Sequence, residues 1–459
     1  MKLALPSVLR APLAAVLVAA AVMSGAAPAG ALAPATYDPS RDIPPAPGTP
    51  GPPVPMRQTT VCATSAVVPD SQFDTIPASH AFGVPELHTH ATGAGQRVAV
   101  IDSGVAPNAR LPRLLAGGDY IMGGDGLSDC DHHGTLIAGI IAAQPASGDG
   151  FVGVAPDAEI LSIRQSSRAF GPENSADRDV SASTVGTLAA SIRRAADEGA
   201  TVINLSVTSC IPAASSTAMA PELMGALAYA ALEKDAVIIA SAGNLSQACT
   251  ANPGPDPNAP ADDRGWEKVA SVSLPSYADQ FVLSVGGTTL TGDAYVNTMP
   301  GPWVDVAAPA VNIVSLDPAD ADRGGLINAE ITQQGPAPLS GTSFAAAYVS
   351  GLAALIREKH PDLNAEQVRN RIINASSSSA WTTNNTMGHG QVDALRALTG
   401  RVSHLPPQAQ NIPDTRLTHP WKPAPESKAP RFIGLGMLAV LIIVLLGLGF
   451  ARVLRRDDE

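Results

Sequence analysis

Short apolar runs alternate with longer runs of small and apolar residues through the middle of the chain. The short runs have the length of strands and are apolar at successive positions, which is typical of strands buried in a parallel sheet. Strands are expected at 97–105, 159–163, 201–206, 236–244 and 281–286, and helices at 187–198, 223–234 and 343–359. Such alternation predicts an α/β fold with a mostly parallel central sheet and helices on both faces.

The N-terminal segment has the pattern of an export signal. Lys2 and Arg10 flank its start, an apolar run covers 11–25, and small residues follow as far as Ala33. We therefore expect a secretory signal peptide at 1–33, cleaved after one of the small residues at its end. An uncleaved N-terminal anchor is the alternative, although the run is short for a membrane span.

The C-terminal segment has the pattern of a membrane anchor. Residues 432–451 carry no charge, and arginines follow in the tail 452–459. Length and flanking charge predict a transmembrane helix with its C-terminal tail in the cytoplasm. A buried core helix is the alternative, but an apolar run at the end of the chain has no neighbours to pack on. The domain between the two segments should lie outside the cell, tethered to the lipid bilayer.

The composition argues against nucleic-acid binding and indicates how the rest of the chain is organised. The chain has 459 residues, of which 15% are charged, and a net charge of −12, whereas nucleic-acid binding requires clustered basic residues. Proline is dense in 34–55, so we expect the segment 34–80 to be an extension that wraps the main domain at 81–400, with a disordered linker as the alternative. A second Pro-rich stretch, 401–430, should link that domain to the membrane. Four cysteines in an exported chain suggest two disulfides, with three pairings open.

Ser343 is the candidate nucleophile. A run rich in small residues begins beside it and ends before Pro361, which predicts a helix with Ser343 near its N-terminus. Unpaired backbone N–H groups and the positive end of the helix dipole would stabilise an oxyanion there. A serine that only caps the helix is the ordinary alternative. The choice depends on whether a base and an acid are placed to help it.

Candidate partners for Ser343 occur upstream. Asp102 and Asn244 end predicted strands, and His133 opens a predicted helix. Because the carboxyl ends of parallel strands meet at one edge of a sheet, these side chains should lie close together. Each has an ordinary structural explanation when taken alone, such as a turn or cap for Asp102. His132 is the alternative base.

Four short motifs in chain order resemble those of the subtilisin-like serine proteases, the subtilases. They are Asp102-Ser103-Gly104, His133-Gly134-Thr135, Ser241-Ala242-Gly243-Asn244 and Gly341-Thr342-Ser343. The resemblance implies a subtilisin-like peptidase in which Ser343 attacks a peptide carbonyl, His133 takes its proton and Asp102 orients the imidazole. It also implies that the backbone N–H of Ser343 and the side chain of Asn244 form the oxyanion hole.

The resemblance extends to the substrate site and puts specificity in doubt. It implies contacts with substrate from Asn204, Leu205, Ser206, Val207, Ala242 and Gly243. Thr208 and Ser209 stand where broad-specificity relatives have glycine, so their side chains should narrow the pocket. Ala347 stands where subtilases usually have proline, which should affect helix shape more than chemistry. No metal or cofactor site is expected, and His88 and His90 are interpreted as surface histidines.

Taken over the whole chain, the organisation resembles the mycosins, membrane-anchored subtilases that accompany type VII secretion systems. That resemblance implies the disulfides Cys62–Cys130 and Cys210–Cys249, protein substrates and association with the secretion membrane complex. It leaves two hypotheses open. One is an active endopeptidase that cleaves selected secreted proteins, and the other is a structural component of the complex with little turnover.

Overall fold

A parallel sheet forms the centre of the protein. The computed structural model describes residues 32–177, 180–218, 220–254, 264–377, 383–406, 437–446 and 448. Seven strands form the main sheet in the order β12-β11-β9-β7-β3-β5-β4, and every neighbouring pair is parallel. Their bounds are β3 Arg97–Asp102, β4 Leu114–Asp119, β5 Glu159–Arg164, β7 Val202–Leu205, β9 Val237–Ser241, β11 Val282–Thr288 and β12 Val304–Pro309.

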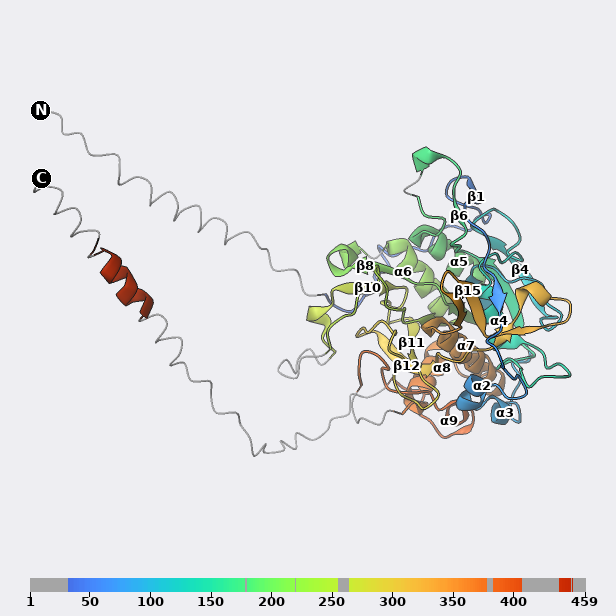
Figure 1. The fold of residues 1–459 in the computed structure, drawn as a ribbon. Coiled ribbons are helices and arrows are strands. Elements are labelled where there is room, and N and C mark those ends of the chain that lie inside the picture. Colours follow the sequence, from blue (N-terminus) through green and yellow to red (C-terminus); the bar gives the residue numbers. More distant parts are fainter. Residues whose placement is uncertain are drawn as a thin grey trace, which may run out of the picture. The chain divides into compact units, whose positions relative to one another are not determined.

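Helices cover both faces of this sheet, as the alternation predicted (Figure 1). Within β3, Val98 and Val100 belong to one buried cluster, whereas Ala99 and Ile101 belong to another, because successive side chains point to opposite faces. The first cluster packs beneath α4 His133–Ala142 and α7 Thr342–Lys359, and the second beneath α5 Val185–Asp197 and α6 Pro221–Ala228. The other α-helices in the domain are α2 Pro77–Phe82, α3 Val84–Leu87, α8 Ala365–Ala375 and α9 Ala394–Thr399.

Two helices differ in detail from the expected ranges. Thr184 caps α5 in a reciprocal capping box with Thr187, so this helix begins at Val185. The helix expected at 223–234 is α-helical only to Ala228 and continues as a π-helical turn, Tyr229–Glu233. The helix α7 runs without interruption through Ala347, where the resembled family usually has proline.

The topology places the candidate residues at one edge of the sheet. From β3 the chain builds β4 and β5 on one side and then β7, β9, β11 and β12 on the other. Strand order therefore reverses beside β3, and the crevice at the carboxyl ends of β3 and β7 is the usual place for a ligand in such a sheet. Asp102 ends β3 at this position, and Asn244 lies just beyond the end of β9.

The extension at 34–80 lies along the domain. Its strand β1 Met56–Gln58 pairs with β6 Phe170–Pro172, and β2 Ser65–Ala66 pairs with the hairpin of β15 Ala329–Thr332 and β16 Gly335–Pro338. Just before the extension, the Ala33 carbonyl accepts a hydrogen bond from the Tyr277 hydroxyl, 2.6 Å away. These partners lie at distant sequence positions, so the segment crosses several elements of the domain.

The four cysteines form the two disulfides that the family resemblance implied, Cys62–Cys130 and Cys210–Cys249. The first joins the extension to the segment just before His133. The second joins β8 Ser209–Pro212, which pairs with β10 Ser271–Leu274, to the loop after Asn244.

Both terminal predictions fall mainly outside the described residues. Only residues 32 and 33 of the expected signal peptide, and 401–406 of the expected linker, are described. Residues 437–446 and 448 of the expected span are helical. Among the described residues, no helix has both the length and the apolar character needed to cross a membrane. Elsewhere in the domain, β13 Ser315–Leu316 pairs antiparallel with β14 Leu326–Ile327.

Candidate active site

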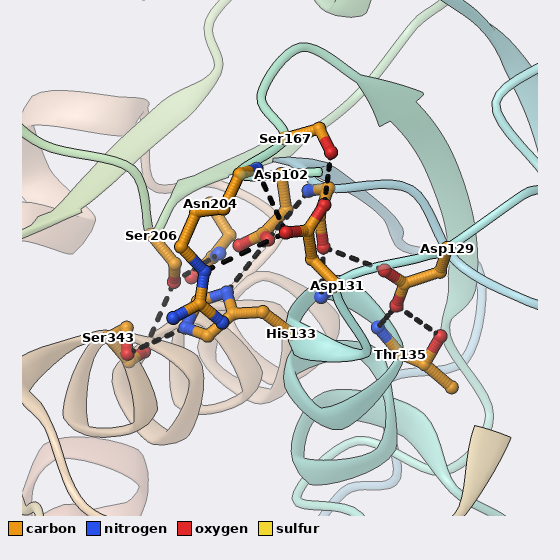
Figure 2. Close-up of polar contacts among 12 residues, drawn as sticks. Asp102, Asp129, Asp131, His133, Thr135, Ser167, Asn204, Ser206 and Ser343 are labelled. Carbon is orange, nitrogen blue, oxygen red and sulfur yellow. Dashed lines mark hydrogen bonds and ion pairs between the residues drawn. The ribbon is translucent and has the colours of Figure 1, made fainter. Parts of the chain in front are cut away.

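The structure brings Asp102, His133 and Ser343 together (Figure 2). Nδ1 of His133 lies 2.7 Å from Oδ1 of Asp102, and Nε2 lies 2.9 Å from Oγ of Ser343. Asp102 is 1% exposed, so its carboxylate is shielded from water. A ring placed between an acid and a hydroxyl in this way can accept the hydroxyl proton while the acid stabilises the imidazolium.

Close packing of two chain segments sets this geometry. A Cβ on Gly134 would lie 2.0 Å from the Gly104 carbonyl oxygen and 3.2 Å from Cβ of Asp102. Only glycine at position 134 therefore allows the first turn of α4 to approach the turn after β3. The Gly134 N–H donates a hydrogen bond to the Ser103 hydroxyl at 2.9 Å, which joins the same two segments.

The charge around His133 favours its protonated form. Burial disfavours the imidazolium, but the charge and hydrogen bond of Asp102, with a further contribution from the charge of Asp129, outweigh burial and raise the pKa of His133. The Arg168 guanidinium acts in the opposite direction on the same pKa. The pKa of His133, and so the pH above which the ring can act as a base, is therefore set by at least three neighbouring charges.

His132, the alternative base, faces elsewhere. Its Nδ1 lies 3.2 Å from the Ser65 hydroxyl in the extension, and its backbone is left-handed, with φ of 65°. Because of this conformation, α4 begins at His133, and the imidazole rings of His132 and His133 point in different directions. The Ser343 hydroxyl is in hydrogen-bond reach of His133.

The start of α7 presents donors beside Ser343. The Thr342 N–H donates a hydrogen bond to Oδ1 of Asn244 at 3.1 Å, which fixes the amide and leaves Nδ2 available as a donor. A Cβ on Gly341 would lie 3.4 Å from Oγ of Ser343 and 3.5 Å from Nδ2 of Asn244. The absence of a side chain at Gly341 keeps open the space between nucleophile and amide, where an oxyanion would form.

A buried hydrogen-bond chain ties β7 to α7. The Ser206 hydroxyl donates to the Ser343 carbonyl at 3.1 Å and accepts from Nδ2 of Asn204 at 2.9 Å. The Ser350 hydroxyl in turn donates to Oδ1 of Asn204 at 2.9 Å. Figure 2 shows Ser206 beside Ser343, with Asn204 leading away from it. The position of the nucleophile along the helix axis is thus fixed from the sheet.

The six residues expected to contact substrate fall into two groups. Ser206 and Val207 line the cleft together with Thr208 and Asn244. The other four are not part of the cleft lining; Asn204, Leu205 and Ala242 are buried, and Gly243 lies at the turn before Asn244. Alternating apolar and polar positions in a strand identify its two faces but not which residue borders a cleft formed by a distant helix.

The cleft itself has a volume of about 500 Å³ and runs past His133 and Ser343. One wall follows the residues after β7, and the other includes Glu330, Thr332 and the end of β16. None of the described residues of the extension is part of its lining, although β2 pairs with the hairpin that is. In the part of the chain that the structure describes, no three His, Cys, Asp or Glu side chains are grouped to hold a metal ion.

Sequence reasoning missed Asp129. Its carboxylate accepts hydrogen bonds from the Ser103 hydroxyl at 2.8 Å and from the N–H and hydroxyl of Thr135 at 2.8 and 2.6 Å. Burial raises its pKa despite these bonds. The sequence feature that could have indicated Asp129 is its position four residues before His133, because the turn into the helix can bring the carboxylate close to the imidazole.

Comparison with known proteins adds a family match and close relatives. The family model for the subtilase family matches residues 93–390. Mycosin-3 of Mycobacterium tuberculosis is 42% identical over 429 residues, covering 90% of this chain and 92% of that relative. Mycosin-1 of the same organism is 42% identical over 435 residues, covering 92% and 94%.

Solved structures agree with these matches. The MycP3 protease from the type VII (ESX-3) secretion system is 47% identical with a TM-score of 0.74, covering 80% of this chain and 100% of that one. A chain in an intact ESX-5 inner membrane complex is 40% identical with a TM-score of 0.77, covering 92% and 100%. The similarity therefore includes both the fold and most of the sequence.

Proposed function

The chain belongs to the subtilase family, and within it to the mycosins, and we propose that it is a membrane-anchored extracytoplasmic endopeptidase of a type VII secretion system. The observation that carries the proposal is the position of His133 between Asp102 and Ser343, with hydrogen-bond distances on both sides. Its reaction is the hydrolysis of peptide bonds in selected secreted proteins.

In this mechanism Ser343 attacks the scissile carbonyl while His133 accepts its proton and later donates it to the leaving amine. Asp102 holds the imidazole in the tautomer with its proton on Nδ1 and stabilises the charge that develops. Nδ2 of Asn244 and the backbone N–H of Ser343 stabilise the oxyanion, and removal of one such donor costs about 10²–10³ in kcat in subtilisin. The main chain of the substrate lies along Ser206 and Val207.

Membrane anchoring by 432–451, with the preceding domain outside the cytoplasm, is part of the same proposal. The uncharged run and the arginines after it support this orientation. Additional support comes from a related structure, which belongs to the periplasmic assembly of the ESX-5 inner membrane complex.

A fluorophosphonate probe tests the assignment of the nucleophile. The full-length chain, solubilised in detergent, should be labelled, whereas Ser343→Ala and His133→Ala should not. Asp102→Asn should react far more slowly, because the imidazole then loses its orienting acid. Labelling of Ser343→Ala at the wild-type rate would contradict the role of Ser343.

A second candidate function is structural, as a stabilising part of the secretion complex with little turnover. The observation that favours it is the similarity to a chain within the intact ESX-5 inner membrane complex. Cells that carry Ser343→Ala distinguish the candidates. Normal secretion and complex yield in that strain, together with loss of both in a deletion strain, would assign the essential role to the structural function.

A further inference from the structure

One cation lies among the residues that line the cleft. Of the described residues in that lining, Arg168 is the only lysine or arginine, and its side chain is 76% exposed. The guanidinium also lies close enough to His133 to lower the pKa of that ring. An arginine so exposed beside a reacting histidine is available to whatever enters the cleft.

The backbone of Arg168 is fixed, so the side chain projects from a rigid support. Its N–H donates to Oδ1 of Asp131 at 2.9 Å, and the Ser167 hydroxyl donates to the other oxygen of the same carboxylate. The next residue, Ala169, accepts a hydrogen bond through its carbonyl from the Thr59 N–H at 2.8 Å, which ties the segment to the extension. The loop before β6 is therefore held at both ends.

The guanidinium itself is weakly engaged. It lies 3.7 Å from Oδ1 of Asp131 and 3.9 Å from Oε2 of Glu330, both beyond hydrogen-bond distance. Within the described part of the chain it donates no hydrogen bond. Such long, exposed pairs contribute little, whereas a carboxylate that met the planar fork directly would form two parallel charge-assisted bonds.

The two neighbouring acids differ in how well they can compete with a carboxylate ligand for the guanidinium of Arg168. Both oxygens of Asp131 already accept hydrogen bonds, and its side chain is 6% exposed. Glu330 is 24% exposed and is positioned by β15, where it is the pairing partner of Ser65. The most accessible charge in this part of the cleft is therefore positive.

We propose that Arg168 is a specificity-determining residue that selects peptide substrates with a carboxylate side chain near the scissile bond. The inference rests on the proposed function, because it assigns a preference to the same cleft. The substrate carboxylate takes the place of Glu330 beside the guanidinium, so that Glu330 acts as a weak internal competitor for the site.

A randomised octapeptide library, with cleavage products read by mass spectrometry, tests the preference with the full-length chain in detergent. Wild type should enrich Glu and Asp over Gln and Asn at one position by about fivefold, the effect expected of one exposed charge pair. Arg168→Gln should remove the enrichment, and Arg168→Lys should retain only part of it. Glu330→Gln should increase it, because the internal competitor is lost.

Arg113→Gln is the matched control. Arg113 is also exposed and paired with an acid, Asp157 at 2.9 Å, but it does not line the cleft. Fluorophosphonate labelling of every variant verifies that the site is assembled. Enrichment that is absent, or unchanged in Arg168→Gln, would overturn the inference, as would enrichment of Lys that disappears in Glu330→Gln. A library left intact by wild type would instead contradict the protease function, and the inference with it.

Discussion

Replacement of Gly341 by alanine should remove most activity, although it replaces no group that takes part in the reaction. Gly341 precedes α7 with φ of 154° and ψ of 156°, a conformation found almost only in glycine. The added methyl would lie 3.4 Å from Oγ of Ser343 and 3.5 Å from Nδ2 of Asn244. Because the methyl would contact both atoms, we expect it to crowd a substrate carbonyl oxygen that binds between them.

The magnitude follows from where the oxyanion must lie. A donor stabilises it from about 2.7–3.1 Å, so an oxygen bound to Nδ2 of Asn244 would press against the methyl. The variant should therefore lose at least the contribution of one donor, about 10²–10³ in kcat, which corresponds to about 3–4 kcal/mol of transition-state stabilisation. The unfavourable backbone conformation should also lower the free energy of unfolding by about 1–3 kcal/mol.

Steady-state kinetics on a quenched peptide and urea unfolding separate these two effects. Gly148→Ala is the matched control, because Gly148 has φ of 104° and no atom within 4 Å of the position its Cβ would take. That variant should lose stability to a similar degree and keep its activity. If Gly341→Ala retained kcat within about threefold of wild type, the open space beside Asn244 would not be the oxyanion site.

Three further outcomes are expected. Asp129→Asn should lower the pKa of His133, and because the neutral ring is the base, the acid limb of kcat/KM should move to lower pH; an unmoved limb would remove Asp129 from the electrostatics of the site. Replacement of Cys62 and Cys130 by serine removes a disulfide that spans a sequence separation of 68, and it should lower the free energy of unfolding in urea by up to about 4 kcal/mol. An unchanged free energy of unfolding would show that the strands alone hold the extension in place. Burial raises the pKa of Asp305 to about 6, even though Arg369 opposes the shift, so the folded state keeps a proton that the unfolded chain releases. The free energy of unfolding should therefore decrease as pH rises from about 4 to about 6. In Asp305→Asn this decrease should be smaller.

The sequence predicted the centre of the fold well because the signals there are local. Buried strands such as β3 are continuous apolar runs, and the turn after β3 follows from Asp102-Ser103-Gly104. Ser343 was placed at a helix start because the small-residue run begins beside it. The relative placement of these residues then follows from a general property of parallel sheets, which present their carboxyl ends at one edge.

The walls of the cleft were not predictable in the same way. In the hairpin, β15 alternates apolar and polar residues over only four positions, Ala-Glu-Ile-Thr, and β16 reads Gly-Pro-Ala-Pro, which is not a typical strand sequence. Arg168 and Glu330 meet across a long stretch of sequence, and no periodic pattern links them. The resemblance to the subtilases predicts that Asn204 contacts substrate, and the sequence does not show that its amide is hydrogen-bonded to Ser206 and Ser350.

The pairing of the extension has a consequence for the order in which the protein folds. The N–H of Val68 donates to Oδ1 of Asn328 at 2.8 Å, a contact between residues 260 positions apart, and β2 completes a sheet with β15 from the same region. Although this segment is among the first to be synthesised, its partners emerge near the end of the domain. Contacts of such high sequence separation form slowly, because the intervening chain must first be closed into a loop. The segment that pairs with the hairpin of the cleft wall should therefore be one of the last to dock, after the rest of the domain has folded.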